Sequence, residues 1–227
     1  MINISMNFKK LKKQIRQSFP KFIIKFLDSS YQSILILTAK FKINRILKNN
    51  LPIKLEIGAG DVLGANGWTT LDSSVKCDLT WDLRNGIPFP SNSISIIYSS
   101  HLFEHLRYNE IIALLKECNR VLKVGGTFSI CVPNSRIFIE AYFNKDSSFW
   151  DSKKSFYNPA FYNTNSPMDW VNYVAYMHDE HKYMFDETNI VNILTSVDFK
   201  SSAIRAFDPT IDIPERQEDS LYAIAYK

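Results

Sequence analysis

Two short apolar runs, each ending in residues suited to a nucleotide ligand, constrain the fold of this chain more than any other feature. The first run is Lys54-Leu-Glu-Ile-Gly-Ala-Gly60, and the second, Trp68-Thr-Thr-Leu-Asp72, ends in a carboxylate. The first predicts a buried strand that enters a tight loop, because glycine lacks the Cβ atom that would keep a ligand off the backbone. The second places Asp72 where it accepts hydrogen bonds from a ribose diol. Together they predict the first half of a nucleotide-type site.

The distribution of glycine supports this prediction. The chain has 7 glycines, and none of them lies in residues 1–50 or 128–227. Glycine is therefore confined to the part of the chain where the expected strands end and loops begin. An open α/β sheet binds its ligands at such places.

The composition fits a globular domain with an appendage. With 227 residues, of which 45% are hydrophobic and 22% charged, the chain is able to build a full core, and global disorder is not expected. Its 3 cysteines, Cys77, Cys118 and Cys131, lack metal-ligand spacing, which predicts buried thiols in a reducing compartment. We expect no signal peptide, and no apolar run is long enough to span a bilayer.

Positive charge is concentrated near the N-terminus. Residues 1–50 hold eleven lysine and arginine residues and one acidic residue, Asp28, which gives them a net charge of +10. Since the whole chain carries +4, residues 51–227 carry −6. An acidic main domain argues against a nucleic-acid groove, so no nucleic-acid partner is expected.

Residues 1–50 are expected to form a basic, amphipathic helical arm. Apolar residues recur at three- and four-residue spacing over residues 8–27, and Pro20 predicts a break or a restart of the helix. A second helical stretch is expected over residues 32–47. Two interpretations stay open. Either the helices dock on their own domain, or residues 8–27 make a peripheral membrane contact with their lysines toward anionic lipid.

Strands and helices alternate from residue 53 onward, which predicts an α/β fold. We expect strands at 53–57, 68–72, 77–82, 94–99, 127–132, 201–207 and 221–226, and helices at 109–123 and 186–194. Asn109 and Asp186 are the expected N-caps of the two helices. This alternation predicts a doubly wound, mostly parallel sheet whose last two strands form an antiparallel edge.

The segment from 134 to 185 is rich in aromatic residues and loops, and we expect it to cover the site. Its aromatic residues include Tyr157, Phe161, Tyr162, Trp170, Tyr173, Tyr176 and Tyr183. Such residues suit stacking on sugar rings, and they equally suit a hydrophobic lid. Both interpretations stay open.

Five motifs follow one another in residues 51–227. They are Leu55-Glu-Ile-Gly-Ala-Gly60, Gly67-Trp-Thr-Thr-Leu-Asp72, Trp81-Asp-Leu-Arg-Asn-Gly-Ile-Pro-Phe-Pro90, Ser99-Ser-His-Leu-Phe-Glu-His105 and Arg120-Val-Leu-Lys-Val-Gly-Gly126. In their order and spacing they resemble the class I S-adenosylmethionine-dependent methyltransferases. More narrowly, they resemble the small bacterial branch often associated with surface-glycan, or polysaccharide, biosynthesis. The resemblance implies a Rossmann-like fold with a seven-stranded sheet.

The resemblance also implies S-adenosylmethionine as the cofactor, together with the residues that bind it. They are Glu56, Gly58 and Gly60 beneath the methionine portion, Asp72 at the ribose, Asp82 and Leu83 at the adenine, and Ser99 and Ser100 near the sulfonium. The chain departs from the family where the last helix closes, because Asp198 replaces the usual glycine there. Aspartate tolerates the left-handed conformation better than most residues.

A nicotinamide-dependent dehydrogenase is the nearest competitor, since it also combines a glycine loop with a following acid. Its fingerprint is G-x-G-x-x-G. Here Leu63 stands three positions after Gly60, and Gly64 comes one position too late. The fingerprint therefore fails at its third glycine.

The 4 histidines form two sequence pairs, His101 with His105 and His178 with His181. In the expected fold both pairs lie over the carboxyl ends of the strands. They are either polar rim residues or the source of a general base, for which His105 is the first candidate and His181 the second. The string His101-Leu-Phe-Glu-His105 matches H-x-x-E-H, but a protease uses that string on a long helix, and none is expected here.

We expect an enzyme that transfers a methyl group from S-adenosylmethionine to a small-molecule or glycan acceptor, at a hydroxyl oxygen. Its expected location is cytoplasmic, with the inner face of the membrane as an option. Two alternatives stay open. One is a scaffold that binds cofactor or partner without turnover. The other is metal-assisted transfer through Glu104, His105 and His181, although no metal ligand is assigned.

Overall fold

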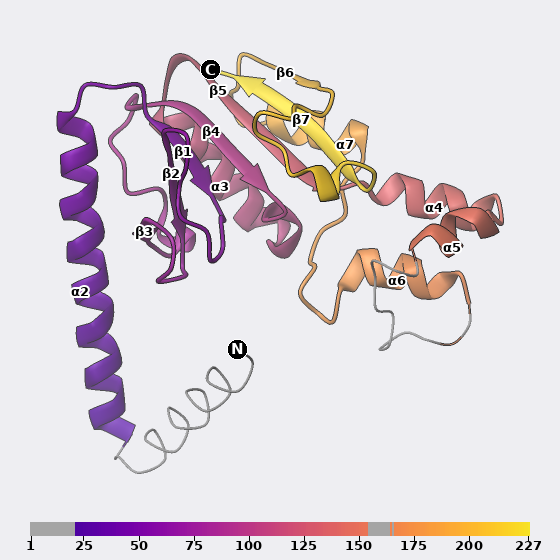
Figure 1. The fold of residues 1–227 in the computed structure, drawn as a ribbon, viewed down its shortest axis with the longest axis horizontal. Coiled ribbons are helices and arrows are strands. Elements are labelled where there is room, and N and C mark those ends of the chain that lie inside the picture. The colour runs from indigo at the N-terminus through magenta and orange to yellow at the C-terminus, as the bar shows by residue number, and fades with distance from the viewer. Residues whose placement is uncertain (1–20, 154–163, 165) are drawn as a thin grey trace.

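Seven strands form one sheet in the part of the chain that the structure describes, residues 21–153, 164 and 166–227 of a computed structural model. Their order across the sheet, shown in Figure 1, is β3 (Leu79–Thr80), β2 (Trp68–Asp72), β1 (Lys54–Ile57), β4 (Ile94–Ser100), β5 (Leu122–Pro133), β7 (Ser220–Tyr226) and β6 (Ser201–Ile204). The pairs from β3 to β5 are parallel, whereas β7 is antiparallel to both β5 and β6. The predicted mostly parallel sheet with an antiparallel edge is confirmed.

The register of the central strands brings their carboxyl ends to one edge of the sheet. Ile57 at the end of β1 pairs with Leu71 of β2 on one side and with Ser99 of β4 on the other. The loops that follow these three strands therefore start from neighbouring points. This edge is where an open parallel sheet binds ligands.

Helices and short turns connect and flank the strands. The helices are α2 (Lys21–Lys48), α3 (Tyr108–Val121), α4 (Ser135–Phe143), α5 (Ser147–Lys153), α6 (Met168–Tyr176) and α7 (Glu187–Thr195), and the 3₁₀ turns are η1 (Leu83–Asn85), η2 (Phe103–His105) and η3 (Pro214–Arg216). In α3 the buried residues recur at helical spacing, from Ile111 through Leu115 to Cys118, and they pack into the main core with the strands. The amphipathic pattern of the sequence thus fixed which face of α3 is buried.

Several predicted boundaries were wrong. Helix α3 begins one residue before Asn109, and its N-cap is Arg107, whose backbone N–H donates to Glu110 Oε2 at 2.8 Å. Strand β3 is much shorter than the predicted 77–82, and β6 ends at Ile204. Strand β5 starts directly after α3 and includes both glycines expected to open it, and Gly125 has a left-handed φ of +79°.

Two predictions about the last helix were correct. Asp186 is the N-cap of α7, and its Oδ1 accepts hydrogen bonds from the backbone N–H groups of Thr188 and Asn189. Asp198 follows this helix with φ of +66°, so it occupies the left-handed position that the family fills with glycine.

Helix α2 docks on the β3 side of the sheet. The loops from β1 to β2 and from β2 to β3 contain no helix. The C-terminal part of α2 instead contributes Ile43 to the main core, and Lys42 Nζ donates to Asp78 O at 2.7 Å. The part of the arm nearest the domain therefore packs on the domain.

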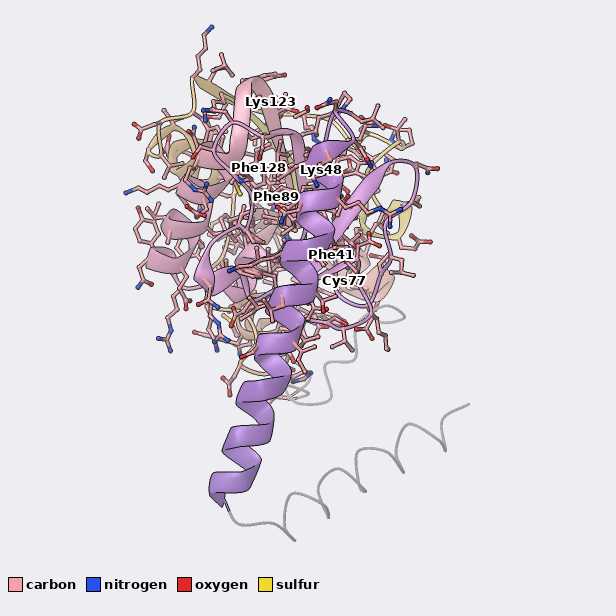
Figure 2. The ribbon with its side chains drawn as sticks, turned by 90° about the vertical axis from the view of Figure 1, so that its left-hand side faces the viewer. Phe41, Lys48, Cys77, Phe89, Lys123 and Phe128 are labelled. Atoms are coloured by element: carbon pink, nitrogen blue, oxygen red, sulfur yellow. The ribbon has the colours of Figure 1, made fainter. Side chains whose placement is uncertain are left out.

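The predicted arm differs from the observed one in its boundaries. Helix α2 is continuous from Lys21, directly after Pro20, whereas the second helix was expected to begin near residue 32. The predicted first helix falls largely in residues 1–20, which lie outside the described part of the chain. Figure 2 shows α2 crossing the near side of the molecule and extending beyond it, with Phe41 on the part of the helix that lies over the domain.

Helices α4, α5 and α6 form a small lobe beside the sheet (Figure 1). The lobe has its own apolar cluster, in which Phe138, Trp150 and Trp170 pack together, with Trp150 and Trp170 stacked at a centroid distance of 6.2 Å. The described part of segment 134–185 is therefore mainly helical and not loop-rich as predicted. The expected cover residues Tyr157, Phe161 and Tyr162 lie outside the described residues.

One ion pair ties α3 to the loop between η1 and β4. Arg120 Nη2 donates to Glu117 Oε2 at 2.7 Å and to Ile87 O at 2.9 Å, while Nη1 donates to Phe89 O at 3.0 Å. Glu117 Oε2 also accepts from the backbone N–H of Ile87 at 2.9 Å. The pair satisfies backbone groups of an irregular segment that would otherwise need water.

We predict that Glu117→Gln destabilises the protein by about 1 kcal/mol at pH 7, because a charge-assisted hydrogen bond becomes a neutral one. The hydrogen bond from Arg120 lowers the pKa of Glu117 below its ordinary value of 4.5. The stability that Glu117 adds is therefore present above about pH 4.5 and lost as the pH falls through the lowered pKa. Urea unfolding across this range should show the difference between wild type and variant shrinking toward acid.

Glu140→Gln is the matched control for this experiment. Glu140 Oε1 lies 3.7 Å from Arg136 Nε in an exposed pair, which contributes little to stability. A loss in Glu140→Gln equal to that in Glu117→Gln would contradict the structural role of the Glu117–Arg120 pair.

Candidate active site

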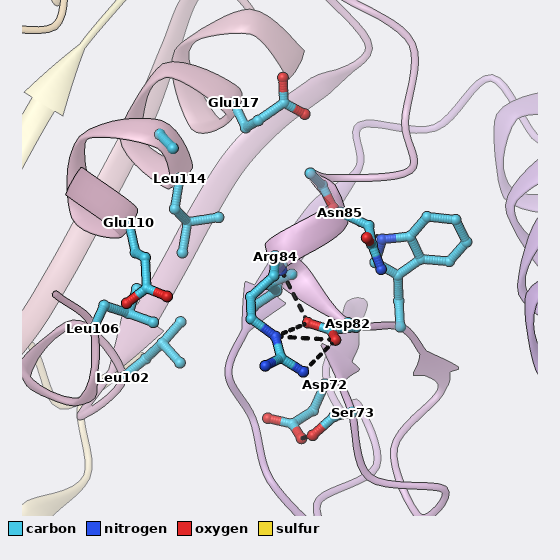
Figure 3. A pocket seen from close by; sticks show the side chains of 14 residues that line it. Asp72, Ser73, Asp82, Arg84, Asn85, Leu102, Leu106, Glu110, Leu114 and Glu117 are labelled. Carbon is cyan, nitrogen blue, oxygen red and sulfur yellow. Dashed lines mark hydrogen bonds and ion pairs between the residues drawn. The ribbon is translucent and has the colours of Figure 1, made fainter. Parts of the chain in front are cut away.

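A cavity of about 710 Å³ opens at the carboxyl ends of the central strands. Figure 3 shows its two walls: Asp72, Asp82 and Arg84 lie on one side, and Leu102 and Leu106 lie opposite them with α3. The cavity is large enough for a drug-sized ligand or a nucleoside. One wall carries the carboxylates of Asp72 and Asp82, and the α3 wall carries leucine side chains together with Glu110 and Glu117.

Asp72 is fixed at the tip of β2. Its Oδ2 accepts a hydrogen bond from the Gly60 backbone N–H at 3.1 Å, and its Oδ1 accepts one from the Ser74 backbone N–H at 2.9 Å. These bonds orient the carboxylate while its oxygens keep further lone pairs for a ligand. The glycine loop after β1 and the end of β2 thus form one unit, as the sequence predicted.

Asp82 occupies the same wall but is paired within the protein. Arg84 Nη2 donates to Asp82 Oδ2 at 2.6 Å and Arg84 Nε donates to Asp82 Oδ1 at 2.9 Å (Figure 3). The hydrogen bond from Arg84 lowers the pKa of Asp82, so this carboxyl is ionised at neutral pH. Leu83, the predicted partner at the adenine, lines the cavity beside Asp82.

The two loop glycines are required for different reasons. A Cβ atom on Gly58 would lie 2.8 Å from the Leu102 side chain, and Gly58 also has a left-handed φ of +72°. Gly60 has φ of +63°, but a Cβ atom there would meet nothing within 4 Å. Gly58 therefore makes room for a cavity-lining leucine, whereas Gly60 serves the turn that donates to Asp72.

The other predicted cofactor residues lie at the same strand tips but do not line this cavity. Glu56 is half-buried in β1, and burial raises its pKa against the opposing effect of Arg216. Ser99 is buried at the end of β4, where its Oγ has no hydrogen-bond partner among the described residues. Ser100 Oγ accepts a hydrogen bond from Arg216 Nη1 at 2.7 Å.

Arg216 reaches this edge because the loop that carries it is anchored. Arg205 Nη2 donates to Asp212 Oδ1 at 2.7 Å, and the Tyr98 hydroxyl donates to the same oxygen at 3.0 Å. Asp212 is buried, so the pair holds the segment after β6 against β4. Arg216 was not predicted from the sequence, because nothing local in the sequence marks a residue of η3 as a neighbour of β4.

The segment from His101 to His105, here called the histidine corner, links β4 to α3. His101 has a left-handed φ of +53°, and only the last three residues of the corner form the 3₁₀ turn η2. The string H-x-x-E-H therefore does not lie on one helix, as expected. Leu102 within the corner and Leu106 after it line the cavity, so the corner adjoins the predicted cofactor site.

Backbone hydrogen bonds bring His181 to the corner. Lys182 N donates to Glu104 O at 2.7 Å, and Tyr183 N donates to the same carbonyl at 3.2 Å. The imidazole rings of His105 and His181 consequently pack edge to face, with centroids 5.0 Å apart. The structure thus unites the two histidines predicted for catalysis, which are separated by 76 positions in the sequence.

Each of these two histidines has its Nδ1 atom beside a backbone carbonyl. His181 Nδ1 lies 2.7 Å from Val174 O, and His105 Nδ1 lies 3.3 Å from Glu180 O. A carbonyl oxygen only accepts, so Nδ1 carries the proton in both rings and Nε2 keeps its lone pair. Burial lowers the pKa of His181, which keeps this ring neutral at physiological pH.

Glu104 lies between the histidines of the corner. Its Oε1 is 3.5 Å from His101 Nδ1 and 3.9 Å from His105 Nε2. The side chain is almost fully buried, and burial raises its pKa to about 8. Neither carboxylate oxygen has a hydrogen-bond partner within the described part of the chain.

Comparison with known proteins places a methyltransferase domain over this site. Residues 55–130 match the family model described as a methyltransferase domain. The match runs from β1 into β5, and it includes the glycine loop, Asp72, Asp82 and the histidine corner. No curated protein matches the chain in sequence.

Several solved structures are similar to the chain at low sequence identity. An S-adenosylmethionine-dependent methyltransferase from Mesorhizobium loti is 16% identical, with 85% of this chain and 100% of that chain covered and a TM-score of 0.48. A methyltransferase of the same description from Archaeoglobus fulgidus is 14% identical, with 83% and 92% covered and a TM-score of 0.47. The 1,6-didemethyltoxoflavin-N1-methyltransferase of Burkholderia thailandensis, with bound S-adenosylhomocysteine, is 13% identical, with 89% and 85% covered and a TM-score of 0.48.

The domain match and the cavity agree on the class of this protein. The chain contains a methyltransferase domain, matched over residues 55–130, and its cavity fits S-adenosylmethionine as the methyl donor. The residues present fit that cofactor, because an oriented carboxylate, a second carboxylate and an apolar wall suit a ribose diol, an adenine amine and an adenine face.

Gly58→Ala is expected to weaken binding of S-adenosylhomocysteine at least tenfold and to destabilise the protein by about 1–3 kcal/mol, since it adds a clash to backbone strain. Adding Leu102→Ala should restore only part of the stability, because it removes the two Cδ contacts but leaves the contact with the Cβ atom of residue 102 at 2.8 Å and the backbone strain. Calorimetric titration and thermal unfolding measure the two effects.

Gly67→Ala is the matched control for strain alone. Gly67 has φ of +82°, and a Cβ atom there would meet nothing within 4 Å. It should lower stability without lowering affinity for S-adenosylhomocysteine. If Gly58→Ala bound this ligand as tightly as Gly67→Ala does, the packing of Leu102 on Gly58 would have no role in the site.

Proposed function

We propose that this enzyme methylates a hydroxyl oxygen of a small-molecule or glycan acceptor. The observation that carries the proposal is the contact of His105 with His181 at the histidine corner, whose Leu102 lines the cavity together with Leu106 after it. In both rings Nδ1 lies beside a backbone carbonyl oxygen, and the Nε2 atom, on the other side of the ring, is available as a base. An acceptor bound beside the cofactor would lie near imidazole groups that are able to remove its hydroxyl proton.

The cofactor roles follow from the arrangement of the cavity. We assign Asp72 to the ribose hydroxyls, because its orientation is already fixed by Gly60 and Ser74. Asp82 would accept a hydrogen bond from the exocyclic amine of adenine in place of the one from Arg84, whose side chain is exposed. Leu83 and Leu102 would cover the two faces of the ring.

The chemistry divides into positioning and proton removal. Bound S-adenosylmethionine supplies an electrophilic methyl group with a good leaving group. The protein must hold the acceptor oxygen in line with it, and such orientation supplies about 7–11 kcal/mol in favourable cases. A hydroxyl is a weak nucleophile until its proton leaves, and a positioned base adds about 10²–10⁴-fold. His105 is the first candidate for that base, and His181 is the second.

The proposed acceptor class rests on an exposed aromatic side chain and on the sequence resemblance. Tyr176 is exposed at the end of α6, where it is available to stack on a sugar ring. Trp170 is buried in the core of the helical lobe, so for this residue the structural interpretation replaces the stacking one. A glycan acceptor, and with it a place in polysaccharide biosynthesis, follows from the sequence resemblance alone.

A cytoplasmic location at the inner face of a membrane is proposed on separate grounds. Among the described residues, no helix combines the length and apolar character needed to cross a bilayer. Helix α2 nevertheless exposes Ile34, Leu37 and Phe41, next to Lys40. Together with the +10 charge of residues 1–50, this favours contact with an anionic lipid surface.

His105→Gln should lower kcat for a hydroxyl acceptor by about 10²–10⁴-fold while the affinity for S-adenosylhomocysteine stays unchanged. The assay is methyl transfer to a panel of sugars and small hydroxyl compounds, read by mass spectrometry. His178→Asn is the matched control, because His178 lies in the same segment outside the site and asparagine tolerates its φ of +57°. Wild-type turnover in His105→Gln would remove this residue from the reaction.

The same panel separates the enzyme from a scaffold. An enzyme transfers the methyl group to at least one acceptor. Binding of S-adenosylhomocysteine without transfer to any acceptor across cell-envelope precursors would favour the scaffold.

Flotation with liposomes tests the membrane proposal. The full chain should float with vesicles containing anionic lipid at low salt and should be released at high salt, because each lysine near such a surface contributes about 1 kcal/mol. Replacing Leu37 and Phe41 by Ser should reduce flotation without changing the affinity for S-adenosylhomocysteine. Equal recovery with neutral and anionic vesicles would refute the proposal.

A further inference from the structure

We propose that Glu104, His105 and His181 form a binding site for one divalent transition-metal ion, with Zn²⁺ as the best match. One ligand atom from each of the three residues lies within 4.8 Å of the other two. The role given to the ion below rests on the proposed function, whereas the binding site itself does not.

The spacing of the three groups suits a single ion. Ligand atoms held at about 2.0–2.2 Å from one Zn²⁺ lie within about 4 Å of one another. Glu104 Oε1 and His105 Nε2 are already 3.9 Å apart. The ring centroids of His181 and His105 are 5.0 Å apart, so small side-chain rotations would bring all three ligand atoms within bonding distance of one ion.

The carboxylate of Glu104 independently indicates a missing cation. Glu104 is only 1% exposed, and both of its oxygens lack a hydrogen-bond partner among the described residues. Ionising a carboxyl group that is buried without hydrogen-bond partners is costly, and proteins ordinarily pair such a group or place it on a metal. The charge of Arg216 opposes the rise in the pKa of Glu104, but the hydrogen bond that Arg216 Nη1 donates at this edge goes to Ser100 Oγ.

The two imidazoles are oriented as metal ligands usually are. A ligating histidine almost always donates its other ring N–H to a carbonyl or carboxylate, which fixes the tautomer and the plane of the ring. His181 does so toward Val174 O, and His105 does so toward Glu180 O. Both Nε2 atoms are therefore left with a lone pair on the side of the ring away from that carbonyl.

The ligand set selects the type of ion. Two imidazoles and one carboxylate suit Zn²⁺ and its neighbours in the first transition series, whereas Mg²⁺ prefers oxygen ligands and retains its waters. Three protein ligands leave an open position, which is typical of catalytic zinc sites. His105 is partly exposed, so that position faces the accessible side of the corner.

An ion in this place changes how the hydroxyl loses its proton. A bound ion would lower the pKa of a hydroxyl placed against it, and His105 would then serve as a ligand in place of the base that it provides in the ion-free site. The acceptor oxygen then forms its bond to the methyl carbon while the carbon–sulfur bond breaks with its electron pair going to sulfur. The hydroxyl proton passes to solvent.

Calorimetric titration of the purified, chelator-treated chain with Zn²⁺ tests the site, with Mg²⁺ as the comparison ion. We expect one Zn²⁺ per chain, an increase in Tm on binding, and no comparable binding of Mg²⁺. Glu104→Gln and His181→Gln should each lower the affinity for Zn²⁺ at least tenfold. His178→Asn, which lies outside the cluster, should bind as wild type does.

Thermal unfolding in chelator shows whether the variants are folded. Glu104→Gln should unfold at or above the wild-type Tm there, because it removes a buried carboxylate that has no described hydrogen bond. Absence of Zn²⁺ binding by the wild type, or equal binding by wild type and folded Glu104→Gln, would overturn the proposal.

The same samples separate this inference from the proposed function. Methyl transfer that continues at full rate in chelator, by a chain that binds no Zn²⁺, would refute the metal site and leave the methyltransferase proposal standing. Stoichiometric Zn²⁺ binding that depends on Glu104, without transfer to any hydroxyl acceptor, would refute the acceptor proposal and leave the metal site standing.

Discussion

The reactive side of this protein depends on one backbone carbonyl, that of Glu104. It accepts hydrogen bonds from Lys182 N at 2.7 Å and from Tyr183 N at 3.2 Å. These bonds hold a segment that follows the helical lobe against the turn that follows β4, and so bring His181 to His105. Because they are backbone bonds, they do not depend on the side chains at 182 and 183. Without them the two imidazoles would belong to separate surfaces.

The cofactor side depends on a comparable steric fit. Leu102 occupies the space that a Cβ atom on Gly58 would fill, and it also lines the cavity. The same short corner therefore packs on the glycine loop through Leu102 and presents Glu104 and His105 to the acceptor side. This coupling would let a corner of only five residues serve both ligands of the proposed transfer reaction, with the methyl donor and the acceptor held by one unit.

The fold was largely predictable because its signals are local and repeated. The apolar stripe of α3 at helical spacing, the cap at Asp186 and the left-handed position at Asp198 each follow from short-range rules, and each was confirmed. Errors arose where tertiary packing overrode local pattern. Helix α2 runs continuously from Lys21, whereas a second helix was expected to begin near residue 32, and its C-terminal part packs Ile43 into the main core.

The sequence by itself determined the sheet, the glycine loop and the position of Asp72, since strand spacing and glycine placement act over a few residues, and the resemblance of its motifs implied the cofactor. Only the tertiary structure decided that His181 meets His105, that Arg216 bonds Ser100 at 2.7 Å, and that Glu104 is buried without a described hydrogen-bond partner. These relations join residues that are up to 116 positions apart. The order of residues along the chain does not encode such distances, because they arise only when loops close over a finished sheet.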